Sequence, residues 1–220
     1  MFSSSWRVGI RALSLSNLGN IRAAHSHAYI PPIRLLTNAM PAIRLYALME
    51  REDDPKRCTA AKLVRFKHVM EVKDESRIPK GAIVLDPEAE KALSIEDYGS
   101  IAKHGLLVLD CSWNKLTKFP KIRRGLQHRG LPFMLAANPT NFGKPQKLSS
   151  AEALAASLYI IGERQQAQAL MSIFKWGPVF LDINRERLEE YAAAATSTEV
   201  VAAQNRMLQA MTRTKDDRTD

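Results

Sequence analysis

The sequence predicts an α/β fold with a mostly parallel sheet in its N-terminal half and an all-α C-terminal half. Two observations predict it. Up to about residue 137, short apolar runs bounded by turn residues alternate with helical patterns, which is typical of a parallel sheet covered by helices. After about residue 148, only helical periodicity remains.

Brief apolar runs are expected to form the strands of this sheet. Each run is short, apolar and bounded by turn residues, as buried strands are. The runs are residues 43–49, 69–72, 82–85, 106–109 and 133–137. We find no internal repeat that would group them into smaller units.

Helical patterns lie between the predicted strands. Residues 59–66 follow a polar segment and are predicted to be helical. Ser94 is expected to open the next helix, because Asp97 three residues later gives nearly the spacing of a capping box. Gly105 is expected to end that helix.

The C-terminal third is predicted to consist of helices alone. Ser149 or Ser150 is expected to cap a helix that runs through Ile161, and Gly162 is expected to interrupt it. Further helices are predicted over residues 163–174, 184–195 and 199–211. The charged tail, residues 213–220, is expected to fray.

Composition excludes several classes of protein. The chain has 220 residues, of which 45% are hydrophobic and 25% charged, the balance of a soluble globular protein. No apolar run approaches the roughly 18 residues that span a bilayer, so we expect no membrane protein. Cys58 and Cys111 are too few for a disulfide framework and lack partners at metal-ligand spacing. The sequence therefore predicts a cytoplasmic protein with no metal site.

The charge of the chain points to a polyanionic partner. The formal net charge is +9, and residues 111–151 contain no Asp or Glu. A surface without a partner usually mixes charges of both signs, so we interpret this segment as facing RNA; the alternative is a solvated basic face. The candidate RNA-binding residues are Lys115, Lys118, Lys121, Arg123, Arg124, Arg129, Lys144 and Lys147.

Residues 1–39 form a separate problem. They contain Ser and Arg residues but no acidic residue, as organelle transit peptides do. Met40 precedes a strand-like run, so we favour a mis-called start or an extension without function; a transit peptide and a basic RNA-contacting arm are the alternatives. In every case we expect poor order, because little apolar periodicity offsets the entropy lost on ordering.

Asp110 is the first candidate ligand-binding residue. It directly follows the predicted strand 106–109, and ligands of open α/β sheets bind just past the carboxyl ends of the strands. Its carboxylate can hold a cationic or multi-hydroxyl group, and Trp113 can offer an apolar face. Alternatively, Asp110 caps a helix and Trp113 belongs to the core. Spacing alone does not decide between these interpretations.

Two further segments also follow predicted strands. Asn138, Pro139, Asn141 and Gly143 make a sharply turned loop whose backbone can read the edge of a base, or an ordinary strand-to-helix turn. Thr59 can cap a helix whose N-terminal amides favour a carboxylate or phosphate, or it is a simple N-cap.

Taken together, these segments resemble the small-subunit rRNA aminocarboxypropyltransferase family, a ribosome-biogenesis group of archaea and eukaryotes. The resemblance covers residues 43–192, and its compact length looks archaeal. The matching segments are Asp54-Pro-Lys-Arg-Cys-Thr59, Asp110-Cys-Ser-Trp113, Leu131-Pro, Ala136-Ala-Asn-Pro139, Asn141-Phe-Gly143, Lys147-Leu-Ser-Ser-Ala-Glu-Ala153, Phe174-Lys-Trp176-Gly177 and Asn184.

The resemblance implies a fold related to the knotted, SPOUT-like RNA methyltransferases. It also implies three domains or segments beyond the N-terminal extension. Residues 40–131 would form the α/β domain with cofactor-binding strand ends. Residues 132–212 would form a helical domain that completes the pocket, and residues 213–220 the frayed tail.

The resemblance further implies that S-adenosyl-L-methionine donates its 3-amino-3-carboxypropyl group to a hypermodified pseudouridine of small-subunit rRNA. Thr59 would meet the methionine carboxylate, and Asp110 the ammonium. The Leu109 backbone would hold the ribose hydroxyls, Ser150 would contact the amino-acid arm, and Trp113 would confine the sulfonium methyl. The remaining pair, which would bracket the adenine, is Leu131 and the backbone near Gln146.

Two positions depart from the family pattern: Phe142 stands where Tyr is often found, and Gln146 where an aromatic residue is frequent. Two other functions fit the same sequence. One is an S-adenosylmethionine-dependent rRNA methyltransferase, and the other is a non-catalytic rRNA-binding assembly factor. In each case the expected partner is small-subunit rRNA or a pre-ribosomal particle, and we expect a monomer.

Overall fold

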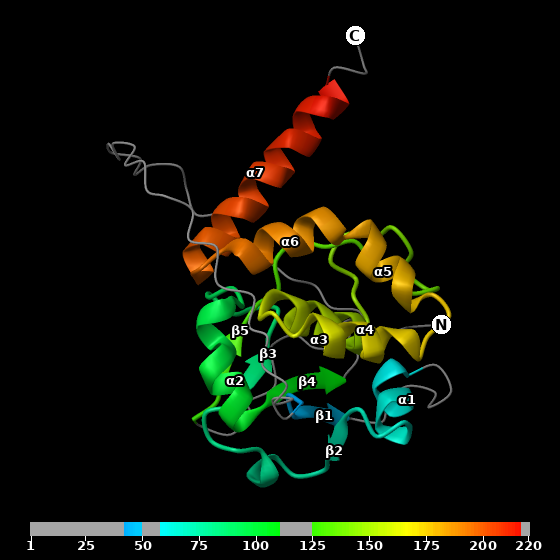
Figure 1. The fold of residues 1–220 in the computed structure, drawn as a ribbon, viewed down its shortest axis with the longest axis vertical. Coiled ribbons are helices and arrows are strands. Elements are labelled where there is room, and N and C mark those ends of the chain that lie inside the picture. The colour runs from blue at the N-terminus through cyan, green and yellow to red at the C-terminus, as the bar shows by residue number, and fades with distance from the viewer. Residues whose placement is uncertain (1–41, 50–57, 111–124, 217–220) are drawn as a thin grey trace.

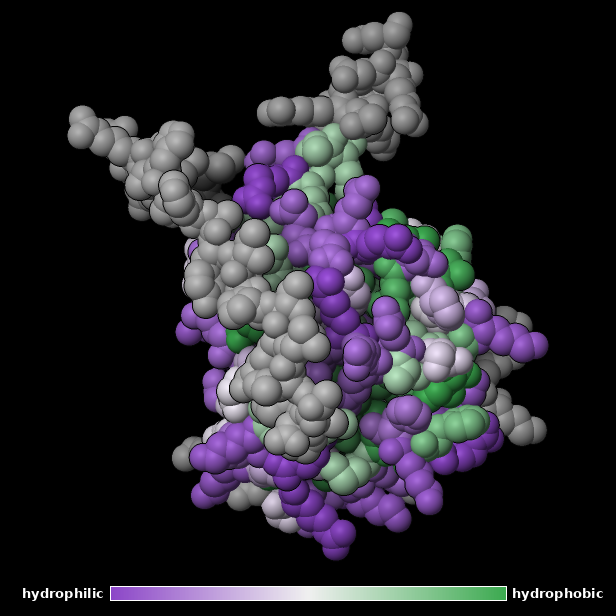
Figure 2. Space-filling model, in the orientation of Figure 1, coloured by the Kyte–Doolittle hydropathy of each residue, from purple (hydrophilic) through white to green (hydrophobic). Residues whose placement is uncertain are grey.

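The computed structural model describes residues 42–49, 58–110 and 125–216. Within these ranges the chain forms five strands and seven α-helices, together with two short 3-10 helices, Glu75–Arg77 and Ile95–Asp97. In Figure 1, helices α3 to α6 lie on one side of the sheet, and the long helix α7 projects from the body. The face seen in Figure 2 is mainly hydrophilic, with hydrophobic residues between the charged ones. The expected extension, residues 1–39, lies outside the described residues.

The strands form a single parallel sheet, which confirms the predicted sheet type. Their order is β2-β1-β4-β3-β5, and every pairing is parallel. The register places Met49, the last residue of β1, beside Asp110, the last residue of β4. The strands are β1 (Leu45–Met49), β2 (Met70–Val72), β3 (Ile83–Leu85), β4 (Leu106–Asp110) and β5 (Gln127–Arg129).

One predicted strand is wrong. Residues 133–137 do not join the sheet: all but the half-buried Leu135 are buried, and their backbone forms only an isolated bridge, between Leu135 and Pro145. The edge of the sheet is instead β5, which is only three polar residues long. Burial explains the error: an apolar run reports that a segment is buried, and not which groups bind its backbone.

The helices follow the predicted caps closely. Ser94 opens the 3-10 helix that leads into α2, with its backbone N–H donating to Asp97, and Gly105 ends α2 at a positive φ of 93°. Helix α5, which begins at Gly177, was not predicted, because seven residues are too few to show periodicity. The helices are α1 (Thr59–Arg65), α2 (Tyr98–His104), α3 (Ser150–Ile160), α4 (Arg164–Ser172), α5 (Gly177–Ile183), α6 (Arg185–Ala193) and α7 (Ser197–Asp216).

Helix α3 is the centre of the molecule. Every one of its residues is buried, and it contacts β4, α1, α4, α5 and α6. A helix that is buried on all sides carries small and apolar residues all round, as the Ala- and Leu-rich sequence of α3 does. The larger core lies between α3 and one face of the sheet, and a smaller one covers the other face. Helix α7 continues through Asp216, four residues into the tail that we expected to fray.

No described helix combines the length and the apolar character needed to cross a membrane.

Candidate functional site

The carboxyl ends of β1 and β4 form the base of the candidate site. Asp110 closes β4 at the edge where ligands of parallel sheets bind, as the sequence predicted. Its side chain is almost fully buried. Since β4 lies between β1 and β3, the elements that follow these strands are brought to the same edge.

Side chains from two helices converge on Asp110. The Cys58 thiol donates to Oδ2 over 2.7 Å, and the Ser150 hydroxyl donates to Oδ1 over 2.7 Å. Thr59 joins the same cluster, because its Oγ1 accepts from the backbone N–H of Ala151 over 3.3 Å. The structure therefore brings together Thr59, Asp110 and Ser150, which lie in three distant parts of the sequence.

Cys58, and not Thr59, is the N-cap of α1. Its backbone is extended, with φ −69° and ψ 117°, and its Sγ accepts from the N–H of Ala61. Thr59 is the first helical residue, so the expectation that Thr59 caps the helix is off by one position. Burial, followed by the charge and the hydrogen bond of Asp110, raises the pKa of the Cys58 thiol to about 12. The thiol is therefore protonated at neutral pH and serves as a hydrogen-bond donor.

A second buried carboxylate, Glu152, lies in the first turn of α3. It accepts from the backbone N–H groups of Ala137 (2.6 Å), Asn138 (2.9 Å) and Ser149 (2.6 Å). The side chains of Asn138 (2.7 Å) and Ser149 (2.8 Å) also donate to it. Burial raises the pKa of Glu152 above its ordinary value, and the hydrogen bonds that it accepts oppose this rise. Glu152 thus ties the loop after residue 137 to the start of the helix that carries Ser150.

Helix side chains bind the backbone of residues 133–135 in place of a neighbouring strand. The N–H of Phe133 donates to Gln204 over 2.7 Å, and its carbonyl accepts from the Tyr191 hydroxyl over 2.9 Å. The Asn184 amide pairs with both the N–H and the carbonyl of Leu135, over 2.9 and 2.8 Å. These bonds satisfy buried peptide groups that would otherwise be costly.

The two residues expected around an adenine lie next to this segment, Leu131 just before it in the sequence and Gln146 bonded to its backbone. Leu131 is buried in the larger core, next to the segment that Phe133 begins. Gln146 has a positive φ of 58°, and its N–H donates to the carbonyl of Met134 over 2.9 Å. Its side-chain Oε1 is buried without a hydrogen-bond partner in the described part of the chain. A buried acceptor of this kind fits a ligand that brings an N–H donor, such as the amino group of adenine.

Leu109, whose backbone we expected to contact the ligand, lies one residue before Asp110 in β4. Its side chain belongs to the smaller core on the opposite face of the sheet from the Cys58 cluster. Only its backbone is therefore available for the role that we expected, which was a contact to ribose hydroxyls. Trp113 lies outside the described residues, as do Lys115, Lys118, Lys121, Arg123 and Arg124.

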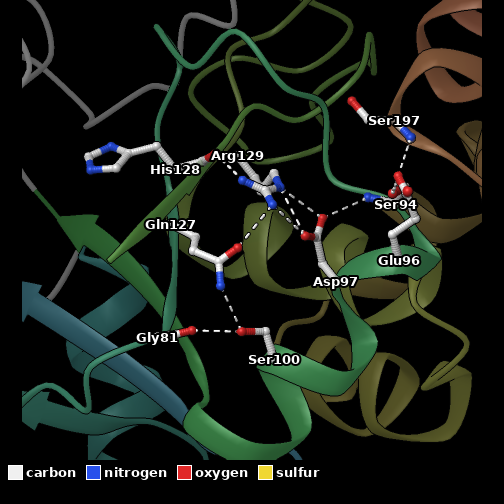
Figure 3. Close-up of polar contacts among 9 residues, drawn as sticks. All are labelled: Gly81, Ser94, Glu96, Asp97, Ser100, Gln127, His128, Arg129 and Ser197. Atoms are coloured by element: carbon white, nitrogen blue, oxygen red, sulfur yellow. Dashed lines mark hydrogen bonds and ion pairs between the residues drawn. The ribbon is translucent and has the colours of Figure 1, made fainter. Parts of the chain in front are cut away.

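Of the candidate RNA-binding residues that the structure describes, Arg129 is engaged within the protein. Figure 3 shows its guanidinium directed at Asp97, with Nε 2.9 Å from Oδ1, and also bonded to Gln127 and to the backbone of His128. Its side chain is 15% exposed. This pairing gives Arg129 a structural role between β5 and the 3-10 helix before α2. Lys144 is exposed and Lys147 is half-buried.

Sequence reasoning missed two residues of the candidate site, Cys58 and Glu152. We considered Cys58 only as a metal ligand, and within the described ranges no group of three His, Cys, Asp or Glu side chains is arranged to hold a metal. Glu152 carried a usable signal, because a Ser three residues before a Glu is a capping box, and the structure confirms that Ser149 is the N-cap.

The fold and the Asp110 cluster define a class of protein: a parallel α/β protein with a buried polar cluster at the carboxyl ends of its strands. Comparisons with known proteins give the family. The family described as "Ribosome biogenesis protein, C-terminal" matches residues 83–208. Archaeal relatives share about half of their residues with this chain over nearly their whole length. The chain belongs to the 16S rRNA aminocarboxypropyltransferase family.

Two archaeal proteins named 16S rRNA aminocarboxypropyltransferase illustrate the similarity. That of Methanopyrus kandleri is 50% identical over 165 residues, which cover 74% of this chain and 98% of that protein. That of Methanosarcina mazei is 51% identical, with 74% and 94% covered. A solved structure, the SAM-dependent rRNA:acp-transferase from Vulcanisaeta distributa, has a TM-score of 0.65 and 37% identity, and covers 78% of this chain and 98% of that one.

Proposed function

We propose that this protein transfers the 3-amino-3-carboxypropyl group of S-adenosylmethionine to a hypermodified pseudouridine in small-subunit rRNA during ribosome biogenesis. The single observation that carries the proposal is the convergence of Cys58 and Ser150 on Asp110 at the strand ends, with Thr59 bonded to the neighbouring Ala151. The names of the archaeal relatives support it, and so does the likeness to the SAM-dependent rRNA:acp-transferase from Vulcanisaeta distributa.

The residues present fit the donor molecule. Asp110 is a buried carboxylate suited to an ammonium group, and two neutral donors, Cys58 and Ser150, orient its oxygens. The unpartnered Oε1 of Gln146 suits the adenine amino group. When bound, S-adenosylmethionine supplies a sulfonium with three electrophilic carbons. The protein selects among them by position, so orientation rather than acid-base chemistry carries most of the rate.

Isotope labelling tests the reaction and separates it from its rivals. The protein is incubated with small-subunit rRNA and with S-adenosylmethionine labelled either in the methyl group or in the carboxyl carbon. We expect only the carboxyl label in RNA. Only the methyl label would show a methyltransferase. Salt-sensitive RNA binding without either label, and without affinity for the donor, would show a non-catalytic assembly factor.

Substitution of Asp110 tests the site. Asp110→Ala is expected to weaken donor binding by about 2 kcal/mol or more, because it removes a charge-assisted contact in a buried place. Calorimetric titration with S-adenosylmethionine measures the effect. Asp182→Ala, which removes an exposed carboxylate on α5, serves as the control and should bind normally. Unchanged binding by Asp110→Ala would rule out this assignment.

The same proposal includes four further statements, which concern RNA contacts, the relationship of the fold, the compartment and the oligomeric state. Lys144 and Lys147, together with the basic residues 115–124, would contact RNA phosphates. The fold would be related to the knotted RNA methyltransferases, which the all-parallel sheet supports. The protein would act in the cytoplasm, and it would act as a monomer.

A further inference from the structure

The loop between residues 134 and 146 is tightly built. Its two arms are bonded to each other, since the N–H of Gly143 donates to Ala136 over 2.7 Å and the N–H of Ala136 donates to Lys144 over 3.1 Å. In the turn between these arms, Asn138 and Asn141 are nearly fully buried, and the N–H of Asn141 donates to the side chain of Asn138. The loop therefore holds its tip in one position.

That tip exposes an aromatic side chain. Phe142 is 63% exposed, the largest fraction among the exposed large hydrophobic residues that the structure describes. A single exposed hydrophobic residue is by itself ordinary on a protein surface. Here a pinned loop presents the ring, and Gly143, Lys144 and Pro145 beside it are exposed as well. The fold itself gains little from a ring placed in this way.

The sequence on either side of Phe142 is basic. Lys144 lies two residues away, and the whole segment 111–151 lacks acidic residues. An exposed ring beside cationic side chains is the arrangement by which proteins bind single-stranded nucleic acid: the ring stacks on a base while the cations contact phosphates.

A short chain of hydrogen bonds connects this tip with the Asp110 cluster. Asn141, the neighbour of Phe142, donates to Asn138, and Asn138 donates to Glu152. Glu152 lies two residues from Ser150, which donates to Asp110. The loop and the candidate site are therefore parts of one rigid assembly built on the start of α3.

We propose that Phe142 is a stacking platform for an unpaired base of the substrate RNA close to the reacting nucleotide, and that Lys144 contacts the adjoining phosphate. The inference rests on the proposed function and adds a specificity-determining contact to it. The ring reads single-stranded character rather than sequence, because every base offers a π-face.

The test compares Phe142→Ala and Phe142→Trp with the unmodified protein. A matched control is Phe66→Ala, because Phe66 is also exposed (51%) and lies beside a basic residue, Arg65, but at the opposite end of α1 from Cys58. Binding of a single-stranded fragment of small-subunit rRNA is measured by fluorescence anisotropy. Binding of S-adenosylmethionine is measured by calorimetry.

We expect Phe142→Ala to bind the RNA fragment about tenfold or more weakly. Phe142→Trp and Phe66→Ala should bind it as the unmodified protein does. All variants should bind S-adenosylmethionine equally, and in turnover the KM for RNA should rise in Phe142→Ala while kcat changes little.

Three outcomes would overturn the inference. RNA binding by Phe142→Ala within twofold of normal would exclude stacking. Equal loss in Phe142→Trp would show that the loop, and not the ring, matters. Normal binding of naked RNA with weaker binding of pre-ribosomal particles would assign Phe142 to a protein contact. Failure of the proposed function is separate, because it would leave RNA without the carboxyl label in the isotope experiment whatever Phe142 does.

Discussion

Two regions of the molecule meet at the start of α3, and their buried backbone groups find hydrogen-bond partners in different ways. At the ends of β1 and β4, strands pair with strands, so the backbone is satisfied and the side chains at the edge face one another. In residues 133–138, the backbone is bonded by side chains from the helices, chiefly Glu152, Asn184 and Gln204. Both regions join parts of the chain that are distant in sequence, but the first uses backbone partners and the second uses side-chain partners.

The two buried carboxylates, Asp110 and Glu152, also differ in their hydrogen-bond partners. Asp110 accepts from two neutral side chains, a thiol and a hydroxyl, which a charged ligand group can displace. Glu152 is fully buried and accepts from five donors, three of them backbone N–H groups. A carboxylate offers about four lone-pair positions, so Glu152 is saturated by the protein. Burial alone therefore does not mark a binding residue; the chemistry of its partners does.

The largest expected effect concerns Cys58. Raising its pKa from 9.0 to about 12 lowers the thiolate fraction at pH 8 by about 1000-fold, so alkylation in the folded protein should be slower by at least that factor than in the unfolded chain. Mass spectrometry after iodoacetamide treatment, in a Cys111→Ser background, measures the rate. Asp110→Asn should restore only part of the reactivity, because burial, the largest cause of the raised pKa, remains.

The same shift has a defined pH dependence. Because the pKa of Cys58 is higher in the folded state, its contribution to stability is fully present below pH 9.0 and is lost as the pH rises towards about 12. Alkylation of native Cys58 within tenfold of the unfolded rate would show that Asp110 does not hold the thiol, and the contrast between the two carboxylates would fail.

The second largest expected effect is a loss of stability on substitution of Glu152. Glu152→Ala leaves several buried N–H groups without an acceptor, and we expect the free energy of unfolding to fall by about 3 kcal/mol or more. Urea unfolding followed by circular dichroism measures it. Glu186→Ala, an exposed carboxylate on α6, is the control and should change stability by less than about 0.5 kcal/mol. Equal effects of the two substitutions would contradict the saturated role of Glu152.

The smallest expected effect concerns Gln146. Gln146→Leu should weaken S-adenosylmethionine binding by about 1 kcal/mol, the usual net value of one hydrogen bond, without lowering stability. Calorimetry compares it with Asn205→Leu, an exposed amide on α7. If Gln146→Leu binds the donor normally, the buried acceptor serves the fold and not the ligand.

Local patterns were sufficient for most of the fold. The caps at Ser94, Gly105, Ser149 and Gly162 were predicted, and the structure confirms them, because capping depends on residues within one turn. The position of Asp110 at a strand end was also predicted. The polar strand β5 and the short helix α5 were not, because neither carries enough residues to show a period.

The sequence by itself determined the α/β class, most helix ends and the family resemblance, which the comparisons confirm. Only the tertiary structure decided that Cys58 binds Asp110, that residues 133–137 are not a strand, and that Arg129 pairs with Asp97. The physical reason is the range of the interactions. Caps and periodicity act over a few residues, whereas a buried peptide or carboxylate takes whichever donor or acceptor the packing brings to it.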